Sequence, residues 1–232
     1  MSTELEQRIE TLAQWMFEAK YIVVFTGAGI STESGLADFR GPDGMWTRRE
    51  KGLPVKPHDF SKAEPNTGHK AIYELQRIGK LKFLISQNVD NLHLKSGIRP
   101  EQLAELHGNI TKLRCRTCEF VMDNFDDLKA CPLCGGTLAP SVVDFGQSLP
   151  QKDLEDAYAH SQKADLFIVV GSSLVVYPAA DMPAVALRAG AKLVIINSGE
   201  TPFDNYAQLR FDEAIREVMP PAIDRLKRLM HK

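Results

Sequence analysis

The chain has 232 residues, of which 44% are hydrophobic and 25% charged, and its formal net charge is -2. This apolar fraction can fill one large core with a small appendage, which excludes disorder as the main state. The even balance of charges excludes a basic nucleic-acid-binding stripe. The sequence shows no bilayer-length apolar stretch and no basic leader followed by an apolar run. We therefore expect a cytosolic or nuclear protein without membrane contact, and we predict the cytoplasm.

Short apolar runs alternate with stretches of helical spacing along most of the chain. Thr3 and Glu6 can cap a first helix, in which apolar residues recur at helical spacing. The apolar runs that we interpret as buried strands are 21–25, 81–85, 166–170 and 193–196, with a shorter one at 103–106. Continuous apolar strands that alternate with helices predict an α/β fold with a doubly wound parallel sheet, covered on both faces.

Small or polar residues follow each of these five strands. They occupy positions 26–32, 86–90, 107–109, 171–173 and 197–198. In open α/β sheets, ligands bind beyond the carboxyl ends of the strands, where loops and helix N-termini converge. A single polar loop is an ordinary turn, but five of them with amides and a histidine predict a ligand site at this edge of the sheet.

The loop after the first strand carries Gly27-Ala28-Gly29. Such a loop lets the backbone approach a pyrophosphate, whose charge is favoured by the free N–H groups of the following helix. It is a partial dinucleotide fingerprint, because Thr32 replaces the third glycine and no acidic residue ends the next strand. No Gly-x-x-x-x-Gly-Lys surrounds it, which disfavours a P-loop kinase or ATPase. Asn197 can bind a ribose hydroxyl or simply end its strand.

All four cysteines form two Cys-x-x-Cys pairs, Cys115 with Cys118 and Cys131 with Cys134. Tetrahedral Zn²⁺ is bound well by four thiolates that two tight turns deliver in pairs. The alternative is two disulfides in a secreted protein. Four thiolates leave no open coordination position for water, so we predict a structural zinc without a catalytic role. A reducing compartment suits such ligands.

Six motifs follow one another along the chain: Gly27-Ala28-Gly29-Ile30-Ser31, Asp38-Phe39-Arg40, Gln87-Asn88-Val89-Asp90, His107-Gly108, the four cysteines and Gly171-Ser172-Ser173-Leu174. Taken in this order, they resemble the motifs of the sirtuins, the NAD-dependent protein deacylases. The resemblance implies a Rossmann-type NAD-binding domain made of residues 1–40, 66–111 and 140–232. It also implies a shortened cofactor-binding loop region at 41–65 and a zinc-binding module at 112–139.

The resemblance further implies the reaction and its residues. NAD is consumed as co-substrate, the acyl group of a protein lysine is transferred to ADP-ribose, and nicotinamide is released. His107 is implied as the general base, a duty that suits a side chain with a pKa near working pH, and Asn88 as the second catalytic residue. The implied NAD-binding residues are Gly27, Ala28, Gly29, Thr32, Asp38, Phe39, Arg40, Gln87, Asn88, Val89, Asp90, His107, Gly171, Ser172, Ser173, Asn197 and Ser198. The implied acyl-lysine segment contains Val143, Phe145 and Gly146.

Within the NAD site, the resemblance assigns a task to each group. Gln87 and Asn88 hold the nicotinamide ribose, and Asp90 with the Val89 backbone binds the nicotinamide carboxamide. Phe39 screens the ribose carbon after nicotinamide departs. The adenosine half is contacted by Ser172, Ser173 and Asn197. By contrast, we interpret His93 as structural.

The sequence departs from the usual sirtuin pattern in two segments. Asp144 stands where an apolar residue is usual and Gln147 where glutamate is usual, which affects peptide preference. Leu36-Ala37 replaces the usual Ile-Pro, and the loss of proline frees the backbone of that loop. Other features lie between the bacterial and archaeal members and the nuclear chromatin-associated vertebrate branch.

Two other functions stay open from the sequence. One is a protein mono-ADP-ribosyltransferase that uses the same site, and the other is a non-catalytic zinc module that binds NAD or ADP-ribose. The expected partners are acylated-lysine proteins or peptides, and we expect a monomer.

Overall fold

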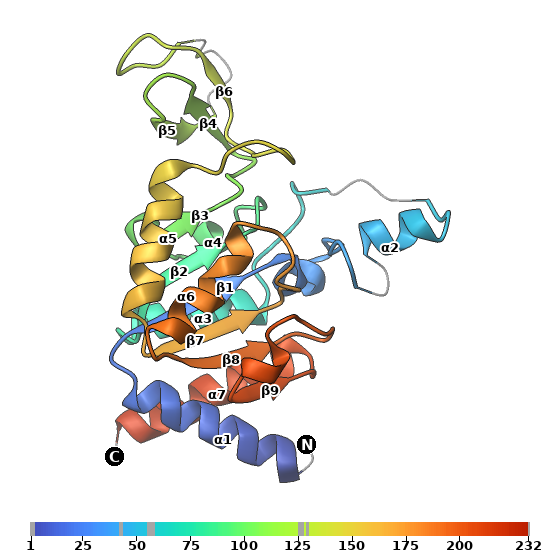
Figure 1. Cartoon of the computed structure of the whole chain (residues 1–232), viewed down its shortest axis with the longest axis vertical. Coiled ribbons are helices and arrows are strands. Elements are labelled where there is room, and N and C mark those ends of the chain that lie inside the picture. Colours follow the sequence, from blue (N-terminus) through green and yellow to red (C-terminus); the bar gives the residue numbers. More distant parts are fainter. Residues whose placement is uncertain (1–2, 42–43, 55–58, 125–127, 129, 232) are drawn as a thin grey trace.

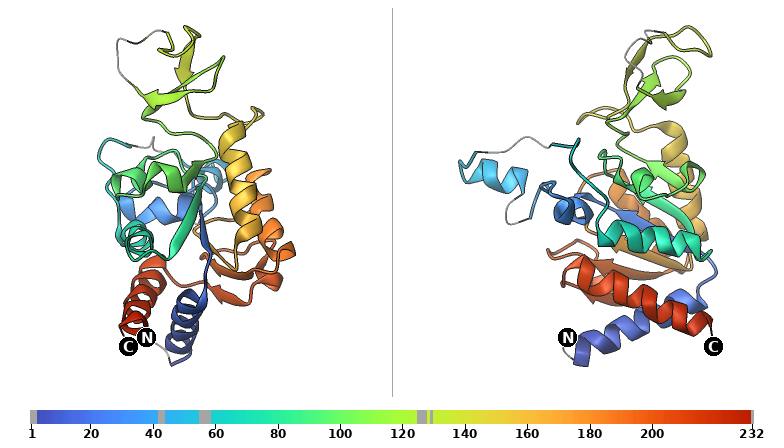
Figure 2. Two further views of the ribbon diagram at one scale, coloured as in Figure 1. Left: turned by 90° about the vertical axis from the view of Figure 1, so that its left-hand side faces the viewer. Right: turned by 180° about the vertical axis from the view of Figure 1, so that it is seen from behind.

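The computed structural model describes residues 3–41, 44–54, 59–124, 128 and 130–231. Its body is a six-stranded parallel sheet between two layers of helices, and a separate three-stranded antiparallel sheet lies beyond one end of that body (Figure 1). Figure 2 shows the same separation from two further sides. The predicted fold class, a doubly wound parallel sheet with a small second module, is confirmed.

The large sheet has the strand order β3-β2-β1-β7-β8-β9, and all neighbouring strands are parallel. Its strands are β1 (Ile22–Thr26), β2 (Leu81–Ser86), β3 (Leu103–Glu105), β7 (Leu166–Val170), β8 (Lys192–Ile196) and β9 (Leu209–Phe211). The chain builds outward from β1 to β3, then returns to β7 on the other side of β1 and builds outward again. The order therefore reverses between β1 and β7, the place where open α/β sheets bind ligands.

Helices cover both faces of the large sheet, because successive strand residues point to opposite faces and both sets are apolar. In β1, Ile22 and Val24 pack into one core, and Val23 and Phe25 pack into the other. The first face is covered by α1 (Thr3–Glu18), α3 (Thr67–Arg77) and α7 (Ile215–Met230). The second face is covered by α5 (Gln151–Lys163) and α6 (Met182–Arg188). Helices α1 and α7 lie side by side (Figure 1).

The small sheet has the order β5-β4-β6 and is antiparallel throughout. Its strands are β4 (Lys112–Cys115), β5 (Val121–Asp123) and β6 (Leu138–Pro140). The short helices are α2 (Met45–Glu50), α4 (Leu92–Lys95), η1 (Ala28–Ser34), η2 (Pro100–Gln102), η3 (Ala179–Asp181) and η4 (Asp204–Tyr206). Helix α2 projects away from the body (Figure 1). Within the described part of the chain, no helix is both long and apolar enough to cross a bilayer.

Two elements refine the sequence prediction. The helix expected after Gly27 is η1, a 3₁₀ helix of seven residues that follows the extended backbone of that glycine. Strand β9 was not predicted, because it has three residues and places the charged Arg210 between Leu209 and Phe211. It forms at the edge of the sheet by pairing with β8.

Candidate active site

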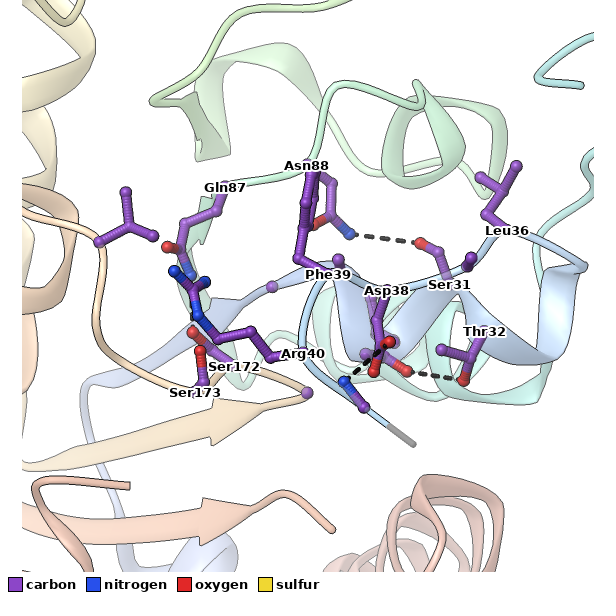
Figure 3. Close-up of a pocket in the computed structure, with 18 of the residues that line it drawn as sticks. Ser31, Thr32, Leu36, Asp38, Phe39, Arg40, Gln87, Asn88, Ser172 and Ser173 are labelled. Carbon is purple, nitrogen blue, oxygen red and sulfur yellow. Dashed lines mark hydrogen bonds between the residues drawn. The ribbon is translucent and has the colours of Figure 1, made fainter. Parts of the chain in front are cut away.

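A cavity of about 1090 Å³ lies at the carboxyl ends of the large sheet's strands, across the switch point between β1 and β7. The loops that follow β1, β2, β3, β7 and β8 all contribute to its lining. The cavity brings together every residue that the sequence analysis assigned to NAD or to the acyl-lysine segment. Figure 3 shows two pairs of side chains from three different loops, in which Asn88 points toward Ser31 and Gln87 lies near Ser172.

The glycines after β1 interlock with the glycine after β7. Gly29 N donates to Gly171 O at 2.8 Å, and Gly171 has a φ of 66°. A Cβ added to Gly27 or to Gly29 would lie 2.8 Å from Gly171 O. Glycine is therefore required here by the contact between two loops of the protein, in addition to any approach of a pyrophosphate. This contact brings the β1 and β7 loops together at the floor of the cavity.

A polar network joins the loops after β1 and β2. Ser31 Oγ donates to Asp90 Oδ2 at 2.6 Å, and Asn88 Nδ2 donates to Ser31 Oγ at 3.3 Å. All three side chains are less than a tenth exposed, and Asp90 Oδ1 also accepts from the backbone N–H of Leu92 at 2.9 Å. The amide and the carboxylate are thus oriented before any ligand binds. The site prediction missed Ser31, although its place in the Gly27–Ser31 motif was a usable signal.

Gln87 ties the β2 loop to the β7 loop on the other side of the network. Its Nε2 donates to Ser172 Oγ at 2.7 Å, and both residues line the cavity (Figure 3). Ser172 is buried, and its hydroxyl oxygen also accepts from the backbone N–H of Leu174 at 3.3 Å. The side chain of Gln87 therefore has a fixed direction. Its backbone carbonyl is the hydrogen-bond partner of His107.

His107 lines the cavity with a ring whose tautomer follows from one contact. Its Nδ1 lies 2.8 Å from Gln87 O, and because a carbonyl oxygen only accepts, Nδ1 carries the proton. In the neutral ring, Nε2 then keeps its lone pair. Burial lowers the pKa of His107, while the hydrogen bond to Gln87 O acts in the opposite direction. The neutral ring is therefore favoured at pH 7, which is the state that a general base needs.

His93 lies behind the cavity, outside its described lining. It is 3% exposed, its Nε2 is 2.9 Å from Thr26 Oγ1, and its ring centroid is 5.0 Å from that of the fully buried His69. Burial, together with the neighbouring His69, holds the pKa of His93 well below its usual value. These contacts support the structural interpretation of His93.

The four cysteine sulfurs meet at one point of the small module. All four lie within 4.8 Å of one another, and three of the Sγ–Sγ distances are 3.4, 3.5 and 3.7 Å. Zn–S bonds of about 2.3 Å in a tetrahedron place the sulfurs about 3.8 Å apart. The cysteines are not joined by disulfides. The donor set and its spacing fit a structural Zn²⁺ held by Cys115, Cys118, Cys131 and Cys134.

Backbone N–H groups of the two turns support thiolates at this site. Thr117 N donates to Cys115 Sγ at 3.4 Å, and Gly136 N donates to Cys134 Sγ at the same distance. Hydrogen bonds from the backbone N–H groups of Cys118 and Thr117 lower the pKa of Cys115 to about 6, whereas contacts with neighbouring cysteine sulfurs raise the pKa of Cys118 and of Cys134 despite their own backbone hydrogen bonds. Because the thiolate is the form that binds metal, the backbone hydrogen bonds favour the ligand state.

The sequence matches the model of the Sir2 family over residues 54–178. NAD-dependent protein deacetylase 1 of Bradyrhizobium diazoefficiens is 40% identical over 250 residues, which cover 96% of this chain and 98% of the relative. The chain belongs to the Sir2 family. It is also 45% identical over 219 residues to NAD-dependent protein deacetylase SRT1 of Oryza sativa, but it spans only 45% of that plant protein.

A solved Sir2 structure with a p53 peptide and NAD⁺ has the same fold. It is 34% identical, has a TM-score of 0.69, and the match covers all of this chain and 98% of that one. The NAD-dependent relatives support NAD as the co-substrate. The four-cysteine cluster fits a structural zinc ion.

The Sir2 loop that contains Asp38, Phe39 and Arg40 stands at the open side of the cavity. Asp38 Oδ1 accepts from Gly41 N at 3.0 Å, and Asp38 O accepts from Met45 N at 2.9 Å, so the start of the loop has a defined turn. Phe39 is 38% exposed and Arg40 is exposed. In Figure 3 both side chains lie over the space between the β2 and β7 loops.

The segment after β6 lies next to His107, where the Sir2 resemblance places the acyl-lysine. Val143 N donates to His107 O at 2.9 Å, and Phe145 is 76% exposed. The two unusual residues form a turn with each other: Gln147 N donates to Asp144 O at 3.1 Å, and Asp144 N donates to Gln147 Oε1 at 3.2 Å. Gln147, which stands where glutamate is usual, thus holds the turn closed with its side chain. Asp144 presents a carboxylate at the rim of the cavity.

Proposed function

We propose that this Sir2 protein is an NAD-dependent protein-lysine deacylase, which transfers the acyl group of a modified lysine to ADP-ribose and releases nicotinamide. The observation that carries the proposal is the cavity at the switch point. There the interlocked glycine loops, the oriented Asn88 and Asp90, and a neutral His107 line one space. The relatives named as NAD-dependent deacetylases support the same function.

Bound NAD supplies the ribose carbon from which nicotinamide leaves and which the acyl-lysine amide oxygen attacks. Asn88 and Gln87 have side chains held by Ser31 and Ser172, and we assign them to the nicotinamide ribose. The oriented carboxylate of Asp90 suits the amide N–H groups of nicotinamide. Because these side chains are already ordered, little reorganisation is needed when the ribose carbon develops positive charge.

His107 Nε2 is the general base of the proposal. The Gln87 carbonyl holds the ring by Nδ1–H, so Nε2 can accept a proton from a ribose hydroxyl. That oxygen then forms a bond to the acyl carbon, the bond from this carbon to the lysine nitrogen breaks, and the lysine leaves as the free amine. Water adds to the same carbon, and its bond to the oxygen on the attacked ribose carbon breaks, which leaves the acyl group on the hydroxyl oxygen of ADP-ribose. A base with a lowered pKa stays unprotonated near neutral pH and is available for this step.

Water must be kept from the ribose carbon while nicotinamide leaves. Phe39 and Arg40 are exposed in a loop that borders the cavity, and we assign Phe39 to screening that carbon once NAD and the acylated peptide are bound. The Val143–Gly146 segment lies next to His107, is exposed from Asp144 onward, and is assigned to the acyl-lysine peptide.

A panel of acylated peptides tests the function. Purified protein is incubated with NAD and peptides that carry acetyl, medium or long acyl groups on lysine, and nicotinamide, free lysine peptide and acyl-ADP-ribose are quantified by mass spectrometry. The proposal expects equal amounts of the three products, formed only when peptide is present. Nicotinamide release without peptide, with a stable ADP-ribosyl adduct, would instead identify the mono-ADP-ribosyltransferase that the sequence left open. NAD binding without any turnover would identify the non-catalytic module.

The domain limits, location and oligomeric state belong to the proposal as well. We propose a zinc module at 112–139, a cofactor-binding loop region at 41–65, and NAD binding by residues 1–40, 66–111 and 140–232. The free thiols favour a reducing compartment, so we propose the cytoplasm, and we propose a monomer. Limited proteolysis, cell fractionation and light scattering test these points in turn.

A further inference from the structure

Asn109 stands two residues beyond His107, outside the described lining of the cavity, and is only 1% exposed. Its side-chain amide uses all of its hydrogen-bonding positions. Nδ2 donates to Glu105 Oε1 at 2.6 Å and to Asn91 Oδ1 at 2.9 Å. Oδ1 accepts from Thr111 N at 2.9 Å and from Thr111 Oγ1 at 2.8 Å. Because a backbone N–H only donates, the contact with Thr111 N fixes which end of the amide is oxygen.

The backbone of Asn109 is held by the buried Ser141, and its carbonyl also accepts from Lys112 N at 3.1 Å. Asn109 N donates to Ser141 Oγ at 2.9 Å, and the same hydroxyl donates to Asn109 O at 2.8 Å. Ser141 begins the segment that we assign to the acyl-lysine peptide, and two residues later Val143 N donates to His107 O. Gly108 fits tightly between them, since a Cβ there would lie 2.0 Å from Ser141 O. The peptide segment and the histidine loop are therefore joined around Asn109.

The same residue reaches the nicotinamide side of the cavity. Its partner Asn91 follows Asp90 directly and has a φ of 65°, and Ile110 N donates to Val89 O at 2.9 Å. The side chain and the next backbone amide thus bind the loop that carries Val89 and Asp90. These bonds fix the distance between that loop and His107.

Asn109 also connects to the small sheet through Glu105. The second oxygen of Glu105, Oε2, accepts from Lys112 Nζ at 2.9 Å, and Lys112 is the first residue of β4. Both side chains of this ion pair are less than a fifth exposed, so solvent screens the pair only weakly. Four parts of the chain, the 87–91 loop, β3, β4 and the 141–147 segment, are therefore joined around Asn109, through its side chain, its backbone and its partner Glu105.

We propose that Asn109 is a positioning residue for the deacylation reaction, which holds His107, the 87–91 loop and the 141–147 segment in one register. The inference rests on the proposed function. A general base acts only when its nitrogen lies within hydrogen-bond reach of the proton it takes, and misplacement by about 1 Å can cost about 100-fold in rate. Asn109 fixes the position of His107 relative to the 87–91 loop on one side and to the 141–147 segment on the other. It acts through these segments and does not touch either substrate.

The hydrogen bond from the neutral amide of Asn109 to the carboxylate of Glu105 allows the positioning role to be tested by a change of charge. N109D replaces the donating amide by a carboxylate, which cannot donate to Glu105 and would place like charges in contact. We expect kcat for the best acyl-peptide to fall about 10- to 100-fold, with an increased peptide KM. Because Asn109 does not line the adenosine part of the cavity, the Kd of ADP-ribose should stay within about twofold of wild type, and one zinc should remain bound.

A reciprocal change should restore the contact. In N109D/E105Q, the new amide at position 105 can donate to the new carboxylate at position 109 and still accept from Lys112. We expect the double variant to recover kcat to within about fivefold of wild type, whereas E105Q alone should not exceed wild type. Such rescue distinguishes positioning from a loss of fold, because two destabilising substitutions without coupling would add.

Wild-type turnover is measured first with the same peptide. An inactive wild type counts against the proposed function. An active wild type with an unimpaired N109D variant, or a double variant no better than N109D, overturns the positioning role. If N109D alone is too unstable to purify, a folded and active N109D/E105Q variant supports the role, and a double variant that is equally unstable overturns it.

Discussion

The two sheets of this protein are stabilised in different ways, and the difference explains where the reacting groups lie. The large sheet separates two apolar cores, and its central strands β1 and β7 are buried at every position. Among the described residues of 112–140, the only buried side chains are Cys115 and Cys131. A sheet with so little apolar burial depends on its metal. The large sheet can hold a preformed polar network, and the small sheet can supply only anchoring contacts to it.

Loss of the metal should have the largest effect and should separate the two sheets. Cys118→Ser removes one of the four ligands, and a structural zinc site contributes about 10 to 16 kcal/mol to folding of the unit that it holds. We expect zinc to be lost and the amides of β4, β5 and β6 to exchange rapidly, while those of β1 and β7 stay protected. Hydrogen exchange with metal analysis measures both.

Leu133→Ser is the matched control for this prediction, because Leu133 lies between two ligands but is 69% exposed. It should keep its zinc and its protection. Slow exchange of β4 in metal-free Cys118→Ser protein would contradict the comparison between the sheets. So would an equal loss of protection in β1.

A change at His107 should greatly reduce turnover and spare both sheets. His107→Ala removes the proposed general base and is expected to lower kcat about 10²- to 10⁴-fold. The ring makes one hydrogen bond, to Gln87 O, so zinc content and hydrogen exchange of β1 should be close to wild type. His160→Gln is the control, since His160 lies on α5 outside the described lining of the cavity and should leave kcat unchanged. A His107→Ala enzyme with near-normal kcat would remove His107 from the mechanism.

The same comparison explains what the sequence could predict. Strands β1, β2, β7 and β8 were found because burial on both faces requires continuous apolar runs, and the zinc cluster was found because its ligands are close in sequence. The loops at the switch point followed from the strand ends. Strand β9 was missed because its charged middle residue breaks the apolar pattern, and its pairing with β8 decides its structure.

Contacts between distant loops could not be read from the sequence. Gly27 and Gly29 predicted a tight approach, but only the structure shows that the approach is to Gly171. Likewise, Asn109 looks like an ordinary turn residue after His107-Gly108, and its bonds to Asn91 and Ser141 depend on where three loops meet. Sequence patterns report which groups are present near a strand end, whereas the orientation of each group depends on partners far along the chain.

Acid should weaken the large sheet through the buried histidine pair. Burial lowers the pKa of His69 from 6.5 to about 4, so the folded state favours the neutral ring while the unfolded state binds a proton below pH 6.5. Stability from this group is complete above pH 6.5 and is lost as the pH falls towards 4, by about 3 kcal/mol. Urea unfolding at several pH values should therefore show a steeper loss for wild type than for His69→Gln.

His231→Gln serves as the matched control, because His231 is exposed at the end of α7. It should follow the wild-type pH dependence. The comparison uses the difference between variants at each pH, so that acid release of zinc from the small sheet, which is common to all of them, cancels. Parallel pH profiles for His69→Gln and wild type would show that His69 does not control acid stability.

The smallest effect is expected at the rim of the cavity, where neither apolar burial nor metal fixes the side chains. Asp144 is exposed in the segment assigned to the acyl-lysine peptide, and a carboxylate there attracts a peptide with lysine or arginine beside the acylated residue. An exposed ion pair contributes about 0.2 to 1 kcal/mol, so Asp144→Asn should lower kcat/KM for such a peptide by no more than about fivefold. The loss should shrink at high salt and vanish for a neutral peptide.

Asp224→Asn is the control, because it removes an exposed carboxylate on α7, and it should change kcat/KM for neither the basic nor the neutral peptide. The turn with Gln147 uses only the backbone of Asp144 and should survive Asp144→Asn, so an equal loss for basic and neutral peptides would contradict the ion pair and with it the comparison between a weakly held rim and the network behind it.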